Sequence, residues 1–67
     1  MSVAKVVEIK SNSTKSFDHA IKSGLKRASK TLKNIKSAWV AEHEVIVEKG
    51  LIAEYRVLMK VTFVLAD

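Results

Sequence analysis

Two side chains in the C-terminal half of the chain have the chemistry to hold a planar, negatively charged ligand. The indole of Trp39 offers an aromatic surface for stacking, and the guanidinium of Arg56 can bind a carbonyl or phosphate oxygen. Each residue also has a plainer interpretation. Tryptophan is enriched at subunit contacts, and an arginine can form an ion pair with a glutamate of a neighbouring subunit, so the residue types alone leave both roles open.

Other polar residues near Trp39 are weaker candidates for metal binding or catalysis. Glu42, Glu44 and Glu48 could hold calcium only if several copies met around a symmetry axis, because the ion needs about six to eight oxygen ligands; solvated carboxylates are the simpler interpretation. His43 can titrate near neutral pH, but it is more typical of an interface or surface position. No cysteine is present and no base, nucleophile and oxyanion donor can be combined, so we expect a protein that is not an enzyme.

Hydrophobic spacing predicts four elements that position these candidates. A segment rich in valine and isoleucine ends in a run of Ser, Asn and Thr residues that favour turns. Apolar residues then recur at steps of three and four, as on one face of a helix, with Ser16 as the N-cap and Asn34 as the stop. Two long strands follow, joined by a tight turn at Lys49-Gly50. The expected elements are a strand over residues 3–10, a helix from 16 to 34, and strands over 37–48 and 51–65.

Gly24 interrupts the apolar stripe of the predicted helix. A glycine costs a helix about 1 kcal/mol relative to alanine. We therefore expect that the missing side chain permits a close approach of the helix to the sheet.

Pairing Glu48 with Leu51 gives a provisional register for the two C-terminal strands. Because side chains alternate across a sheet, one face of the hairpin should carry three opposed pairs: Ser37 with Thr62, Trp39 with Lys60, and His43 with Arg56. The other face, with the three glutamates near its hairpin end, is expected to pack on the helix.

The apolar residues of the sheet exceed what one helix can cover. Beyond the helix-facing side, the opposite side is expected to carry Trp39, Val47, Ile52 and Leu58. An extended apolar patch on long strands marks an association surface, and a chain of 67 residues forms only a small core. The sequence therefore predicts self-assembly with closed symmetry.

Composition narrows the class of protein further. With 48% hydrophobic and 28% charged residues and no proline, a single folded domain over residues 1–67 is expected. No apolar run approaches the roughly 20 residues that span a bilayer, and the first residues lack the pattern of a secretory signal, so we expect a cytoplasmic protein without a membrane partner. Residues 16–34 carry five basic residues and one acidic residue, which favours a solvated helix face and leaves a polyanion as a less favoured partner.

Several segments, in this order and spacing, resemble the dodecin family over almost the whole chain. They are KVVEI at 5–9, RASKTLKNI at 27–35, YRV at 55–57 and KVTFVL at 60–65.

The resemblance implies an α+β subunit of β-α-β-β topology, with a three-stranded antiparallel sheet and one helix on one face. It also implies a hollow homododecamer of cubic symmetry with the helices outside. Flavin-binding members hold pairs of isoalloxazine rings between tryptophans of related subunits, with a glutamine at the ring edge, and have no established catalytic turnover. Aligned without gaps, Ser37 stands at the position of that tryptophan and Arg56 at that of the glutamine. This is similar to a dodecin-like branch without the flavin tryptophan, for which calcium binding has been proposed in a relative.

We therefore expect a non-enzymatic binding and storage protein in the form of a dodecameric shell. Its ligand would be flavin (riboflavin or FMN) or a similar planar anion, held by Trp39, Arg56, Ser37 and His43. The alternative is a structural or calcium-binding dodecin-like assembly without flavin, with the three glutamates as weak metal candidates.

Overall fold

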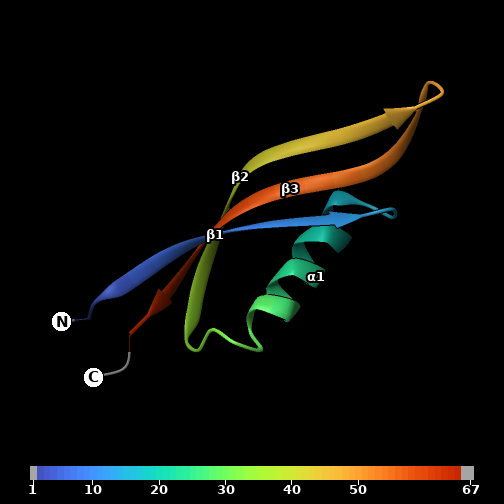
Figure 1. The fold of residues 1–67 in the computed structure, drawn as a ribbon. Helices are drawn as coiled ribbons and strands as arrows, with labels where there is room; N and C mark the ends of the chain where they lie inside the picture. Colours follow the sequence, from blue (N-terminus) through green and yellow to red (C-terminus); the bar gives the residue numbers. More distant parts are fainter. Residues whose placement is uncertain (1, 66–67) are drawn as a thin grey trace.

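The computed structural model describes residues 2–65, which form one antiparallel sheet with a helix on one face (Figure 1). The third strand lies in the middle of the sheet, and its neighbours are the first and second strands. This is the predicted α+β arrangement of β-α-β-β topology. The elements are β1 (Ala4–Ser13), α1 (Phe17–Ala28), β2 (Ile35–Glu48) and β3 (Leu51–Val64).

Strand β1 continues three residues beyond its predicted end. Ser11, Asn12 and Ser13, which were expected to begin a turn, lie opposite residues 57, 56 and 55 of β3. The backbone hydrogen bonds offered by a long central strand outweigh the local turn preference of these side chains. The turn starts only after Ser13, whose side chain is buried and whose Oγ accepts a hydrogen bond from the Lys15 amide at 2.9 Å.

Helix α1 begins as predicted but ends earlier. Ser16 is the N-cap, and its Oγ accepts a hydrogen bond from the His19 amide at 2.9 Å. The predicted stop at Asn34 is wrong, because the helix ends at Ala28 and the chain leaves through tight turns in which the amides of Thr31 and Leu32 both donate to the Ala28 carbonyl. Asn34 instead has a positive φ of 61° at the entry to β2.

The core lies between α1 and the covered face of the sheet. Ala20 from the helix and Val57, Met59 and Val61 from β3 are its fully buried members. Gly24 is the closest point of approach: a Cβ atom there would lie 2.8 Å from Met59 Cε and 2.9 Å from Ser11 Cβ. The predicted role of this glycine in close helix–sheet packing is confirmed.

A β-bulge changes the register in the middle of the β2–β3 hairpin. Ser37 lies opposite Thr62 and Trp39 opposite Lys60, as predicted, but between Val40 and Glu42 the register shifts by one residue. Ala41 is the extra residue on β2, so that two residues there oppose one on β3. The shift is reversed between Ile46 and Val47, and the hairpin ends with Glu48 opposite Leu51.

The hairpin projects beyond the helix, which gives the subunit an elongated shape (Figure 1). Its extents are 51 × 19 × 13 Å and its radius of gyration is 13.8 Å, whereas a compact domain of this length has about 11 Å. The accessible surface is 5159 Å², against about 4200 Å² for a compact monomer of this mass. Among the described residues, no helix has the length and apolar character needed to cross a membrane.

Candidate functional site

The bulge at Ala41 moves His43 to the helix side of the sheet. His43 lies opposite Val57 rather than Arg56, and its ring meets that of Phe17 edge to face, with 4.8 Å between centroids. The predicted pairing of His43 with Arg56 on one face is therefore wrong, because the extra residue reverses the alternation of side chains. The Phe17 ring therefore contacts two rings of the sheet. The second is that of Tyr55, at 5.2 Å between centroids.

The same reversal brings two glutamates to the face that the helix leaves open. Glu42 lies opposite Leu58 and Glu44 opposite Arg56. The prediction that these carboxylates share the helix side is wrong for the same physical reason. Glu48, opposite Leu51 at the hairpin end, is exposed and does not line the cavity described next.

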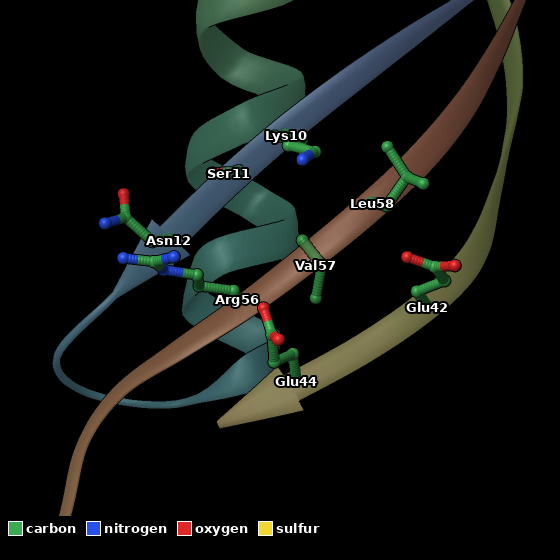
Figure 2. A pocket seen from close by; sticks show the side chains of 8 residues that line it. All are labelled: Lys10, Ser11, Asn12, Glu42, Glu44, Arg56, Val57 and Leu58. Carbon is green, nitrogen blue, oxygen red and sulfur yellow. The ribbon is translucent and has the colours of Figure 1, made fainter. Parts of the chain in front are cut away.

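A cavity of about 250 Å³ is formed where the three strands run side by side on the open face. Figure 2 shows the two glutamates of β2 on one side of β3, and Lys10 and Asn12 of β1 on the other, with the Arg56 side chain directed toward Asn12. Its lining is mixed, with two cations, two carboxylates and a few neutral groups. The lining residues are Lys10, Ser11, Asn12, Glu42, Glu44, Arg56, Val57 and Leu58.

Arg56 is engaged by polar neighbours within the subunit. Its Nη2 lies 3.6 Å from Glu54 Oε2, and Asn12 Nδ2 donates a hydrogen bond to Glu54 Oε1. The hydrogen bond from Asn12, together with the positive charge of Arg56, holds the pKa of the Glu54 carboxyl below its ordinary value. The Arg56 guanidinium, 49% exposed, thus has one carboxylate neighbour within its own strand.

Trp39 lies on the same open face but outside the cavity. Its side chain is 65% exposed, and Lys60 Nζ lies 5.1 Å from the ring centroid, a cation–π contact. The β3 partners of Trp39 and Glu42 are Lys60 and Leu58, which lie two residues apart, or about 7 Å along the strand. The open face therefore has two parts, an aromatic surface at Trp39 with exposed Ser37 beside it, and the polar cavity around Arg56.

The comparisons with known proteins agree with this architecture. A family model described as Dodecin matches residues 3–66. The chain belongs to the dodecin family. A search of curated proteins finds no match.

Solved dodecin structures superpose closely on the chain. The dodecin from Streptomyces davaonensis has 36% identity and a TM-score of 0.93, with 98% of this chain and 97% of that chain covered. A point mutant of the Thermus thermophilus dodecin has 31% identity and a TM-score of 0.94, with both chains fully covered at 100%. The calcium dodecin from Mycobacterium tuberculosis, which has a novel calcium-binding site, has 33% identity and a TM-score of 0.81, with 92% and 89% covered.

Across residues 2–65, no group of three or more His, Asp or Glu side chains could hold an ion. Glu42 and Glu44 are two carboxylates of one cavity, so a metal there would need ligands from another copy of this dodecin.

Sequence reasoning missed Lys10 and Asn12 as lining residues. Asn12 follows from the greater length of β1, whereas Lys10 lay within the predicted strand; both alternate onto the open face, opposite Arg56 and Leu58 respectively. The polar run after Lys10 concealed this, since such residues usually begin a turn.

Proposed function

We propose that this dodecin, a single domain over residues 1–67, forms a closed homododecameric shell in the cytoplasm that binds and stores a small ligand without catalysing a reaction. Membership of the dodecin family and the open face with the exposed indole of Trp39 support the proposal. That indole is the single observation that carries it, because a tryptophan exposed to water on a sheet offers a stacking surface for a planar ring.

The need for assembly rests on apolar side chains that the subunit leaves in water. Large hydrophobic residues are exposed along both long strands and near the chain ends, and patches of this kind mark protein contacts. In a closed shell, neighbouring copies would cover them. They are Val3, Val6, Trp39, Val45, Val47, Leu51, Ile52 and Leu65.

Flavin, as riboflavin or FMN, is the proposed ligand. Its isoalloxazine ring would stack on Trp39, with Ser37 beside it, and its polar chain would reach the cavity of Arg56. His43 drops out of the proposed site, since it contacts Phe17 on the helix side. Two copies facing each other across a symmetry axis would enclose the ring from both sides.

Titration of the purified protein with riboflavin, followed by flavin fluorescence, tests this function. We expect quenching at micromolar flavin, and an affinity about tenfold lower for Trp39→Ala, which loses the stacking surface. Lys26→Ala, on the exposed side of α1, should bind as the wild type does. Absence of quenching in the wild type would rule out flavin.

Calcium binding at subunit junctions is the second candidate. It is favoured by Glu42 and Glu44, which line one cavity on the open face, and by the similarity to a dodecin that is named for calcium. Calcium should then raise the melting temperature, and EDTA should reverse the rise. A melting temperature that does not respond to calcium would end this alternative.

A further inference from the structure

The aromatic surface at Trp39 carries a positive charge beside it. Lys60 lies opposite Trp39 in the sheet, and its Nζ lies over the indole, 5.1 Å from the ring centroid. The indole is largely exposed, whereas Lys60 is partly buried. An ammonium in this position is attracted by the electron-rich face of the ring. A ligand that stacks on Trp39 therefore meets a cation at the same point of the sheet.

The charge of Lys60 has no ion-pair partner among residues 2–65 of the subunit. Glu8 of β1 lies opposite Lys60 on its other side, yet the ammonium lies over the indole of Trp39. Glu8 is exposed, so water weakens its attraction for the ammonium. Lys60 therefore remains available to an anionic group that approaches the ring.

The position of the ammonium makes the charge of a stacked ligand important. A ring that takes the face under Lys60 moves the ammonium aside, and the flexible stem of the lysine lets it reach the edge of that ring. A neutral ring then breaks the cation–π contact without a replacement, whereas an acidic group at the ring edge forms an ion pair with Lys60. A ring on the opposite face leaves the contact intact, and its negative charge is still attracted across the indole. In both arrangements, an anion gains from Lys60 what a neutral molecule of the same shape does not.

We propose that Trp39 and Lys60 form one binding site, which selects planar aromatic ligands that carry a negative charge on the ring or directly beside it. The indole supplies the stacking surface, and Lys60 is the residue that determines specificity. The inference rests on the proposed function, since it takes Trp39 as the stacking surface of this dodecin. It adds the ligand class, aromatic carboxylates and other anions of the ring itself, and this selection does not depend on the direction of any chain attached to the ring.

Calorimetric titration with 2-naphthoate and with 2-naphthalenemethanol tests the inference, because the two probes share one ring system and differ in charge. We expect the wild type to bind the carboxylate about threefold more tightly than the alcohol, as fits an ion pair that stays partly exposed. Lys60→Met removes the charge and keeps an unbranched side chain, so this preference should disappear. Lys60→Arg keeps the charge and the cation–π contact and should retain the preference. Added salt should reduce the preference of the wild type, since salt screens the attraction.

The chain offers a local reporter and a matched control for these titrations. Trp39 is the single tryptophan, so its indole N–H resonance in NMR spectra reports binding at this site. Lys26→Met removes the same charge from the exposed side of α1 and should keep the wild-type preference. A loss in Lys26→Met equal to that in Lys60→Met would assign the effect to net charge and refute the inference.

The same titrations separate failure of the inference from failure of the proposed function. Equal affinities of the wild type for the two probes, or tighter binding of the alcohol, would refute the selection by Lys60 and leave the stacking surface in place. If neither probe shifted the indole resonance, Trp39 would not be a stacking surface, and the proposed function would fail together with the inference.

Discussion

Contacts with Arg56 and Asn12 within the subunit favour the charged form of Glu54. The Arg56 guanidinium lies 3.6 Å from Glu54, and Glu54 in turn accepts a hydrogen bond from Asn12. Each of these contacts favours the charged form of Glu54 and lowers its pKa. A folded-state pKa below the unfolded value stabilises the fold above the ordinary pKa of glutamate, and this contribution is lost as the pH falls through the lowered value.

Replacement of Asn12 by alanine should raise the pKa of Glu54 back toward its ordinary value. The hydrogen bond from Asn12 is the largest cause of the shift, ahead of the charge of Arg56. The carboxyl chemical shift of Glu54, followed by NMR against pH, measures the change. Thr14→Ala, an exposed loop substitution, should leave the titration as it is, and an unchanged Glu54 titration in Asn12→Ala would contradict the assignment.

At the scale of the elements, the bulge in β2 decides which polar side chains share a face. Before Ala41, Trp39 points away from the helix; after it, Glu42 and Glu44 do so, while His43 turns toward Phe17. A bulge adds one residue to one strand and so exchanges the faces of everything that follows. Because of this single residue, the cavity is lined by two carboxylates, Glu44 opposite Arg56 and Glu42 opposite Leu58.

Close packing between α1 and the sheet makes Gly24 sensitive to substitution. We expect Gly24→Ala to destabilise the protein by about 1–3 kcal/mol, because the new methyl group would overlap Met59 and Ser11. Alanine is the better helix former by about 1 kcal/mol, so helix propensity alone predicts the opposite sign. Denaturant unfolding distinguishes the two, with Lys26→Ala as a control expected to stay within about 0.5 kcal/mol of the wild type.

The turn between β2 and β3 contains a lysine in a backbone conformation that another residue type would adopt more easily. Lys49 and Gly50 both have positive φ angles, 53° and 76°, as in a tight hairpin turn of the kind that favours Asn-Gly. Lysine is disfavoured in this region, so Lys49→Asn should stabilise the hairpin by about 0.5–1 kcal/mol. A raised denaturation midpoint is the expected result, and a lowered one would mean that the Lys49 side chain makes a stabilising contact in the assembly.

At the scale of the whole molecule, the projecting hairpin is the part of the subunit that most needs a partner. Val47 and Ile52 are Cα partners beyond the reach of the helix and are 58% and 52% exposed. The elongated shape places this apolar pair far from the subunit's own core. Burial against neighbouring copies would remove both side chains from water.

Val47→Lys should therefore weaken the proposed shell. A charge at an apolar contact is costly to bury, so light scattering should find smaller species than in the wild type. Thr14→Lys, which adds the same charge at an exposed loop, should assemble normally. A wild type that is a stable single subunit would contradict the assembly itself.

Local sequence patterns were sufficient to predict several structural features of this protein. Ser16 as a helix cap, Gly24 as a point of close approach, the turn at Lys49-Gly50 and the pairing of Trp39 with Lys60 were all predicted and are present. Each depends on local backbone preference or on simple alternation from the hairpin turn. The element order and the family resemblance follow from the same local patterns.

Only the tertiary structure decided which side chains meet on the open face. Nothing in Val40-Ala41-Glu42 marks a bulge, because no glycine or proline interrupts the strand there. The extra residue coincides with the contact of His43 and Tyr55 with Phe17 of the helix, which joins three segments far apart in sequence. Side-chain alternation is a local property, but the covered face is chosen by packing between distant elements, and that choice placed Glu44 opposite Arg56.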